Sequence, residues 1–373
     1  MTVLQILIVD DEPAGQVNSI AYEVEPDEAV VVVRHPRDIA QSDLLGSAVV
    51  AVDHYLEDWS ELDSQPLAMQ PANGFALAAV LRSQVDRSVP GPAIVILTGQ
   101  LPRLAGPLPL KAAEHLLAWQ HDVEWVFPKA GAAGDSVAPR LVAMAKAVEK
   151  LRRVWTDPFG LEALVTGWLG LKDPPWSGVA RDHIVRARPP IHSVGDQTLG
   201  ASVLRWFLQR VLPYPTFLSD VWRTAMLLGV ATTWLESELS TESELCDRLD
   251  HCAYSGAFLD FSGRRWWRAG LANLVVELSD GQPFDREAIQ RGVSEMSSGD
   301  PAFLSEARPI LAVDPTTMES TLVVEAEMSV RIGPDGWPFY ADNAWASKAD
   351  VFDNPALADL VLDPVSPPTG PKQ

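Results

Sequence analysis

Five short apolar runs, separated by segments with helical spacing, dominate the first 150 residues. Each run is rich in β-branched residues, is short for a helix and is apolar throughout, which is typical of strands buried on both faces. The runs are residues 3–9, 29–34, 48–53, 93–98 and 123–127. Helical patterns lie between them, for example at 74–84 and 110–119. This alternation predicts a parallel sheet with right-handed crossovers.

A first domain is predicted to end soon after the fifth run. A Gly-rich stretch leads to a helical pattern at 135–155, for which Asp135 or Ser136 is the expected cap. The sequence TDPFG at 156–160 then interrupts the chain with Pro and Gly. We therefore place the first domain at 1–155.

The remainder of the chain predicts a second domain at 160–363, mainly helical with a small β-rich part at its end. Helical spacing recurs in this region at 199–212, 221–230, 232–239 and 264–279. From about residue 305 the pattern changes to short strands and turns, as in 321–340. Residues 364–373 are Pro-rich, and we expect a disordered tail there.

Composition favours a soluble globular protein. Of the 373 residues, 47% are hydrophobic and 21% are charged. Cys246 and Cys252 provide no disulfide framework, and the N-terminal stretch MTVLQILIVDDEP carries acidic residues where a secretory signal would carry basic ones. No apolar run reaches the roughly 18 residues of a membrane span. These features predict a cytoplasmic protein with no membrane contact.

The charge distribution argues against nucleic-acid binding. The net charge is −21, and residues 1–150 hold 10 basic against 20 acidic side chains. Binding to DNA or RNA relies on clustered basic residues that neutralise phosphates. The best cluster is small and consists of Arg264, Arg265 and Arg268.

Five polar side chains stand where predicted strands end. Asp10 and Asp11 end the first strand, Asp53 the third and Thr98 the fourth, and Lys129 follows the fifth. Open α/β sheets bind ligands at the edge where the carboxyl ends of their strands meet, so we expect these side chains to converge. Each acid alone could be a strand-end or helix-capping residue. Five suitable residue types at five strand positions favour a functional site.

Three neighbouring carboxylates repel one another and require a hard divalent cation, for which Mg²⁺ is the natural choice. Lys129 supplies a further positive charge. An aspartate can then attack phosphorus as a nucleophile while the charge on the transferring oxygens is neutralised. Asp53 is the candidate phosphoacceptor because it stands alone on the central strand, beside the pair Asp10 and Asp11.

This set of residues resembles the receiver domain of bacterial two-component response regulators, over about the first 150 residues. The resemblance implies a flavodoxin-like, doubly wound (βα)5 fold with strand order 2-1-3-4-5. It implies that Asp10, Asp11 and Asp53 bind Mg²⁺ together with the backbone carbonyl of Tyr55. It also implies that Thr98 hydrogen-bonds the phosphoryl group and that Lys129 is the lysine of the family.

Three departures from the family pattern accompany this resemblance. Residues 57–72 lengthen the loop before the third helix, and residues 100–110 lengthen the connection toward Lys129. Ala130 follows Lys129, where the family usually has proline. The acid, hydroxyl and lysine positions stay intact, so we expect retained chemistry and an altered signalling surface.

Two patterns in the second half favour structural interpretations. Residues 220–239 resemble a helix-turn-helix unit with a turn at Gly229, but the second helix carries Glu236 and Glu238 and no basic residue. Helical packing explains this segment better than DNA binding. Most of the tryptophans in this half are expected to belong to the core, and a minority could be exposed anchors for a partner protein. The candidates are Trp266, Trp267, Trp337 and Trp345.

Isolated cysteines and histidines in this half fit no known site. Cys246, His251 and Cys252 match neither the spacing nor the ligand count of a structural zinc site, and buried thiols explain them. His183 and His192 could be a phosphotransfer histidine or a catalytic base, although solitary histidines of this kind are more often surface residues.

The sequence therefore predicts a phosphoacceptor signalling protein rather than an enzyme. The expected phosphoryl donors are a histidine kinase, a phosphotransfer protein or a small acyl phosphate. Regulated association with a downstream protein, or with a second copy in a homodimer, is the first hypothesis for output. Transcription control through residues 220–239 is the second, and an unrecognised enzymatic activity is the third.

Overall fold

In the computed structural model, the chain forms two compact units. The described residues are 4–12, 17–57, 59–60, 62–64, 70–85, 89–106, 108, 110–129, 136–156, 159–191 and 199–362. Unit 1 comprises Met1–Pro174, Arg188–Pro213 and Tyr254–Arg264, and unit 2 comprises Pro175–Ala187, Tyr214–Ala253 and Arg265–Gln373. Several predicted features lie outside the described residues: Ala130, the cap at Asp135, His192 and the tail at 364–373.

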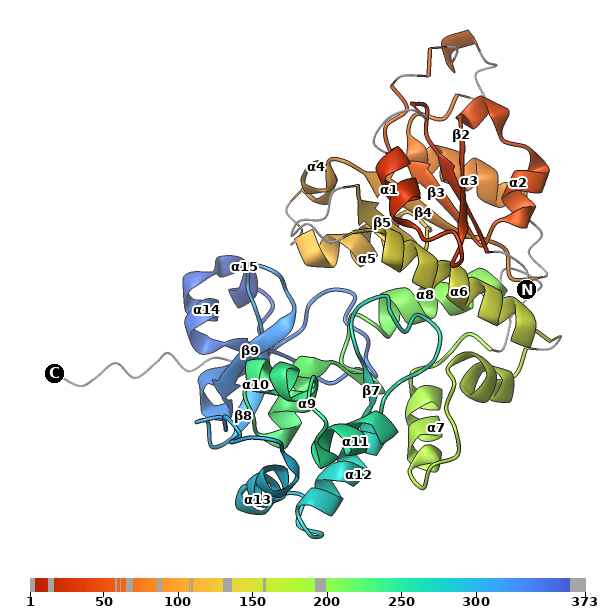
Figure 1. Cartoon of the computed structure of the whole chain (residues 1–373). Coiled ribbons are helices and arrows are strands. Elements are labelled where there is room, and N and C mark those ends of the chain that lie inside the picture. Colours follow the sequence, from red (N-terminus) through yellow and green to blue (C-terminus); the bar gives the residue numbers. More distant parts are fainter. Residues whose placement is uncertain are drawn as a thin grey trace. The chain divides into compact units, whose positions relative to one another are not determined.

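A five-stranded parallel sheet forms the centre of unit 1 (Figure 1). Its strands are β1 (Gln5–Val9), β2 (Val30–Arg34), β3 (Val49–Asp53), β4 (Ala93–Thr98) and β5 (Trp125–Pro128). They pair in the order β2-β1-β3-β4-β5, which confirms the flavodoxin-like order predicted from the sequence. Every residue of β3 and β4 is buried, as their uninterrupted apolar runs require.

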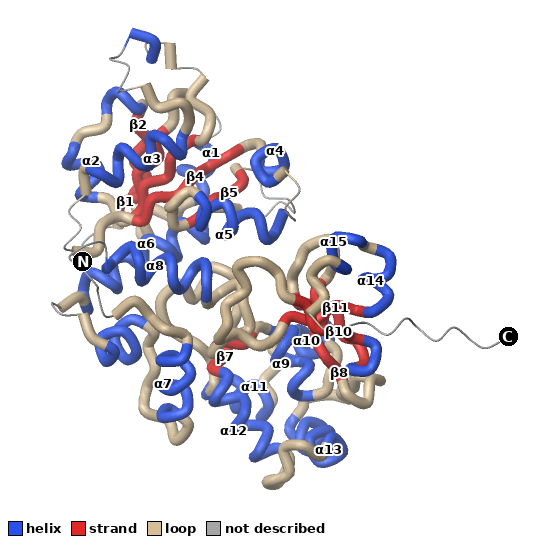
Figure 2. The backbone as a smooth tube through the Cα atoms, turned by 180° about the vertical axis from the view of Figure 1, so that it is seen from behind, coloured by secondary structure: helices blue, strands red, loops and turns tan. Residues whose placement is uncertain are grey.

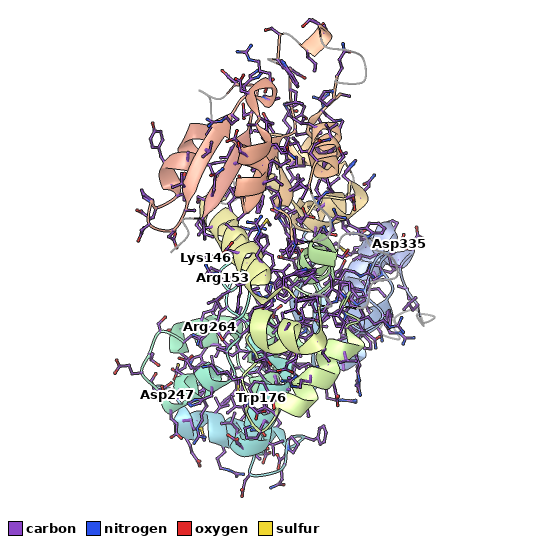
Figure 3. The ribbon with its side chains drawn as sticks, turned by 90° about the vertical axis from the view of Figure 1, so that its right-hand side faces the viewer. Lys146, Arg153, Trp176, Asp247, Arg264 and Asp335 are labelled. Atoms are coloured by element: carbon purple, nitrogen blue, oxygen red, sulfur yellow. The ribbon has the colours of Figure 1, made fainter. Side chains whose placement is uncertain are left out.

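Helices cover the two faces of this sheet (Figure 2). They are α1 (Val17–Glu23), α2 (Gln41–Gly46), α3 (Gly74–Ser83), α4 (Leu101–Ala105), α5 (Leu110–Gln120) and α6 (Ala138–Val154), with short 3₁₀ turns at Pro36–Asp38 and Leu62–Ser64. One core cluster joins α2 through α5 to the sheet, and it includes Leu44 of α2, Leu81 of α3 and Val50 of β3. On α6, Lys146 and Arg153, which Figure 3 labels, are exposed to solvent, whereas Leu141 and Val148 are buried.

Unit 1 also includes chain segments from beyond residue 160. A π-helix (Ala163–Trp168) follows α6, and the buried indole of Trp168 donates from Nε1 to the carbonyl oxygen of Ala147 at 2.9 Å. Helix α8 (Leu199–Arg210) and the segment 254–264 belong to the same unit. The two units therefore do not part at 156–160. The functional division at that boundary stays a prediction.

Unit 2 consists of short helices and two-stranded antiparallel sheets. Its helices are α7 (Ser177–Arg186), α9 (Val221–Leu228), α10 (Thr232–Glu238), α11 (Glu244–His251), α12 (Arg268–Leu278), α13 (Arg286–Met296), α14 (Lys348–Asp353) and α15 (Pro355–Ala358). Its strands are β6 (Leu218–Ser219) with β7 (Trp266–Trp267), β8 (Pro309–Val313) with β9 (Ser320–Glu325), and β10 (Ser329–Ile332) with β11 (Ala344–Ser347). A 3₁₀ turn at Ala326–Met328 joins β9 to β10.

The helix predicted at 264–279 begins later than its sequence pattern indicates. Trp266 and Trp267 form β7 instead, and the backbone N–H of Trp267 donates to the carbonyl oxygen of Cys252 at 2.8 Å. The ring of Trp176, labelled in Figure 3, lies 6.5 Å from that of Trp267. Pairing and aromatic burial override helical propensity at these two residues. No helix within the described residues is long and apolar enough to cross a membrane.

Candidate functional site

Three carboxylates converge at the carboxyl edge of the sheet in unit 1, as the sequence predicts. Asp10 and Asp11 follow β1 and Asp53 ends the neighbouring β3, so parallel pairing of these strands brings the acids together. One carboxylate oxygen from each lies within 4.8 Å of the others, and all three residues are buried. Among the described residues, this is the one group of three or more potential metal ligands.

Lys129 connects two of these acids. Its Nζ lies 2.8 Å from Oδ2 of Asp53 and 3.0 Å from Oδ2 of Asp10. The backbone N–H of Lys129 donates to the carbonyl oxygen of Thr98 at 2.8 Å, which extends the pairing of β4 with β5 as far as the lysine. The ammonium group is therefore fixed by strand pairing as well as by its ion pairs.

A small cavity opens at this cluster, with a volume of about 110 Å³. The side chains that line it are mostly acidic: Asp10, Asp11, Glu12, Asp53, Tyr55, Glu57 and Lys129. The predictions did not include Glu12 and Glu57, because neither ends a strand and acidic loop residues are common. The sequence signal that could have indicated them is their position: Glu12 lies two residues after Asp10, and Glu57 lies four residues after Asp53.

Thr98 lies at the end of β4 with its side chain completely buried. Its Oγ1 accepts a hydrogen bond from the backbone N–H of Gln100 at 3.1 Å. Thr98 does not belong to the described residues that line the cavity. The structure thus places Thr98 on the strand next to Asp53, with its hydroxyl engaged by its own loop.

Gly74 is a residue of this site that the sequence analysis missed. It begins α3 directly behind the end of β3, and its N–H donates to the carbonyl oxygen of His54 at 2.8 Å. A Cβ at this position would lie 2.1 Å from the carbonyl oxygen of Asp53, so no other residue fits without a shift of the backbone. Asn73 caps the helix by accepting from Ala76, and the Asn-Gly pair was the sequence signal for this tight approach.

The cluster holds more negative than positive charge. Burial raises the pKa of the Asp53 carboxyl to about 6, although the hydrogen bond from Lys129 and its charge act to lower it. Burial also acts to lower the pKa of Lys129, but the bonds and charges of Asp53 and Asp10 outweigh burial and raise that pKa. A set of carboxylates that one ammonium group does not neutralise fits a hard divalent cation.

The weaker candidates of the second half do not assemble into a site. Helices α9 and α10 flank Gly229 as predicted. Glu238 on α10, however, is buried, and its carboxylate accepts hydrogen bonds from the backbone N–H and the hydroxyl of Ser298 at 2.8 and 2.6 Å. Cys246 and Cys252 are buried, as expected for structural thiols, and burial raises the pKa of Cys252 to about 12. His251 is exposed at the end of α11.

The remaining candidates are also largely covered. Trp266 and Trp267 are buried, and Trp337 and Trp345 are partly buried, so none of the four is an exposed anchor. His183 lies on α7, and burial lowers the pKa of its imidazole.

Comparison with known proteins adds little to this geometry. No family model matches the chain, and no curated protein is significantly similar to it. Among solved structures, the chain is similar to the crystal structure of the response regulator ChrA of a heme-sensing two-component system, at 17% identity. The match covers 79% of this chain and 98% of that one, with a TM-score of 0.22. This score is too low to support an argument, so the functional conclusion depends on the site.

Proposed function

We propose that this chain is a phosphorylation-dependent response regulator of a two-component phosphorelay, with Asp53 as its phosphoacceptor. One observation carries the proposal: the carboxylates of Asp10, Asp11 and Asp53 meet in one cavity, where Lys129 contacts two of them. The flavodoxin-like sheet supports it, because ligand sites of such sheets lie at this edge.

The proposed reaction transfers a phosphoryl group to the Asp53 carboxylate. A carboxylate oxygen of Asp53 attacks phosphorus, a new O–P bond forms, and the bond from phosphorus to the donor breaks with its electron pair leaving on the donor. The donor would be a phosphohistidine of a histidine kinase or phosphotransfer protein, or a small acyl phosphate. The product is an acyl phosphate on Asp53.

Lys129 would stabilise this transfer electrostatically. Its ammonium group already lies 2.8 Å from the attacking carboxylate, so it can donate to the phosphoryl oxygens without a large movement. Thr98 shares a backbone hydrogen bond with Lys129, and its hydroxyl could turn from its loop toward the phosphoryl group. Both residues would therefore respond to the new charge.

Asp10, Asp11 and Asp53 would hold Mg²⁺, together with the carbonyl oxygen of Tyr55, which lines the same cavity. The bound cation would supply positive charge against the carboxylates and the phosphoryl oxygens. The donor set supports this assignment. Its buried carboxylate oxygens lie within 4.8 Å of one another, and a single lysine does not neutralise all of their charge.

Phosphorylation would act on output by shifting the population of two receiver states. A phosphoryl group adds about 1.5 to 2 negative charges at neutral pH, enough to change which arrangement of Lys129 and its loop is favoured. We propose regulated protein–protein interaction as the output, with the downstream partner recognised through the part of the chain beyond the receiver.

The test is phosphorylation of the purified full-length protein by acetyl phosphate with Mg²⁺. Intact-mass measurement should show the addition of one phosphoryl group to the wild-type protein and none to Asp53→Asn. The matched control is Asp63→Asn, which removes an exposed aspartate of the same unit and should leave the modification unchanged. Equal modification of the Asp53→Asn variant would contradict the assignment.

A further inference from the structure

The edge strand β5 is covered by the chain's own later segments, and this covering begins with a buried ion pair. Glu124 directly precedes β5 and is completely buried. Its carboxylate accepts from Nη2 of Arg82 at 2.6 Å, from the backbone N–H of Ile94 at 2.6 Å and from Nε of Arg205 at 2.9 Å. Arg205 belongs to α8, so this pair attaches α8 to the edge of the sheet within unit 1.

Helix α8 also satisfies backbone groups beside the edge strand. Nε2 of Gln209 donates to the carbonyl oxygens of Val123 and Glu124 at 2.7 and 3.2 Å. Nη2 of Arg205 donates to the carbonyl oxygen of Asp122 at 2.6 Å. Edge strands otherwise offer such groups to another chain. In this protein α8 occupies them.

A second segment, residues 254–264, covers the side chains of β5 through Phe261. The Phe261 ring is buried, and its centroid lies 5.1 Å from that of Trp125 and 6.0 Å from that of Phe127. The guanidinium group of Arg140 on α6 lies 4.7 Å from the Phe261 ring and 4.8 Å from the Phe127 ring. These four side chains form one aromatic and cationic cluster, which we call the Phe261 cluster.

The Phe261 cluster joins the strand before Lys129 to a segment that is flanked in sequence by unit 2. Lys129 follows Phe127 by two residues and directly follows β5, so the strand that leads to the lysine also carries two rings of the cluster. The segment 254–264 is continuous at each end with unit 2, which resumes at Ala253 on one side and Arg265 on the other. A shift of β5 therefore acts on a segment whose two ends belong to the other unit.

We propose that the segment 254–264 is an intramolecular output connection that senses the state of β5 through Phe261. This inference rests on the proposed phosphorylation of Asp53. Before phosphorylation the segment is closely packed on β5. When Lys129 and Thr98 move toward the phosphoryl group, the carboxyl end of β5 shifts, the packing of Phe261 loosens, and unit 2 receives the change through the connected chain.

This assignment differs from signalling by association of two receivers through the same face. Arg205 and Gln209 of the same chain engage polar groups directly before β5, and Phe261 packs against Trp125, so a second copy would have to displace these contacts to reach this face. The structure therefore favours transmission within one chain as the first step.

The experiment is hydrogen–deuterium exchange of the full-length protein with and without beryllofluoride and Mg²⁺. In the wild type, peptides containing Asp53 and Lys129 should change protection on addition. Amides in 254–264 should exchange faster by about fivefold or more, the lower range of typical coupling between two sites. A response at Asp53 and Lys129 with unchanged or slower exchange in 254–264 overturns the connection alone. No response at any of these peptides contradicts the phosphorylation proposal and the connection together.

The variant Phe261→Leu provides an independent arm. It should still respond at Asp53 and Lys129, but 254–264 should exchange faster before any addition. In the wild type we also expect peptides of α12 (Arg268–Leu278), which follow the segment in unit 2, to respond to beryllofluoride, and this response should be lost in the variant. Phe284→Leu, at a completely exposed phenylalanine of unit 2, is the matched control and should behave as the wild type. If Phe261→Leu does not fold, the wild-type arm decides the question. Retention of the α12 response in a folded Phe261→Leu protein overturns the proposal.

Discussion

The two ends of β5 carry buried charge clusters that differ in how their charges are balanced. At the amino end, Glu124 is paired with Arg82 and Arg205 and accepts a backbone hydrogen bond, and Arg205 also pairs with the carboxylate of Asp122. At the carboxyl end, one ammonium group, that of Lys129, faces the carboxylates of Asp10 and Asp53, and Asp11 lies beside them. One cluster is neutralised by its own partners, and the other keeps an excess of negative charge.

The pKa shifts follow this difference. Burial acts to raise the pKa of Glu124, but the charges of Arg82 and Arg205 outweigh burial and lower it. At Asp53, burial dominates over Lys129 and raises the pKa to about 6. A neutralised cluster needs no further charge and becomes costly only when one partner is removed, whereas an incompletely neutralised one indicates a site for a further charged ligand.

Removal of the Glu124 carboxylate should have the largest effect on stability. Glu124→Ala leaves two guanidinium groups without their buried partner, and we expect a loss of about 3 to 5 kcal/mol in the free energy of unfolding. Urea denaturation followed by circular dichroism measures it. Glu28→Ala, which removes an exposed pair with Lys146 in the same unit, should cost less than about 1 kcal/mol. Equal losses in the two variants would contradict the contrast.

Acid should destabilise unit 1 through His115, a group outside both clusters. Burial lowers the pKa of this imidazole to about 4 from the ordinary value of 6.5. Its folded-state pKa is therefore the lower one, so the unfolded chain binds more protons below pH 6.5 and stability falls as the pH drops toward 4. The contribution amounts to about 2 kcal/mol at pH 5 and about 3 kcal/mol at pH 4.

The variant His115→Leu isolates this contribution. As the pH falls from 7 to 5, the wild type should lose about 2 kcal/mol more of its unfolding free energy than the variant does. A difference that stays constant over this range would show that burial does not suppress the charge of His115.

Magnesium should stabilise the cluster at the carboxyl end of β5 and leave the amino-end cluster unaffected. At ten times the dissociation constant, one bound ion raises the unfolding free energy by about 1.4 kcal/mol. Thermal unfolding of the wild type with Mg²⁺ or with EDTA measures the increase. Asp10→Asn should lose it, and Asp63→Asn should keep it. A magnesium effect of equal size in Asp10→Asn would place the ion elsewhere.

Partial neutralisation of the acidic cluster should give the smallest effect, with the opposite sign. Asp11→Asn removes one of three neighbouring negative charges, so without a divalent ion we expect a gain of about 0.5 to 1 kcal/mol in the free energy of unfolding. The same variant should respond less to Mg²⁺ than the wild type. A destabilised Asp11→Asn protein would indicate a structural role for this carboxylate.

The sequence predicts the sheet and the site because their signals are local. The runs around Ile8, Val50 and Ile96 are apolar on both faces, and parallel pairing necessarily collects the residues that end them at one edge. Convergence of Asp10, Asp53 and Lys129 therefore followed from periodicity and topology without knowledge of side-chain positions.

The covering of β5 could not be predicted in the same way. Arg82, Glu124 and Arg205 are separated by 42 and 81 positions along the chain, and no local pattern states which arginine pairs with a given glutamate. The same holds for Phe261, because its apolar side chain predicts that it is buried but does not predict which residues it packs against. The helical pattern over 264–279 also gave no indication that Trp266 and Trp267 pair as a strand.

The central claim is that the excess of carboxylates collects a divalent cation so that Asp53 can accept a phosphoryl group. Fluorine-19 NMR of the full-length protein with beryllofluoride tests it most directly, because beryllofluoride mimics an aspartyl phosphate. The account predicts protein-bound fluorine resonances that require Mg²⁺ and are absent from Asp53→Asn. Bound resonances that persist in EDTA or in Asp53→Asn, or none in the wild type with Mg²⁺, would contradict it.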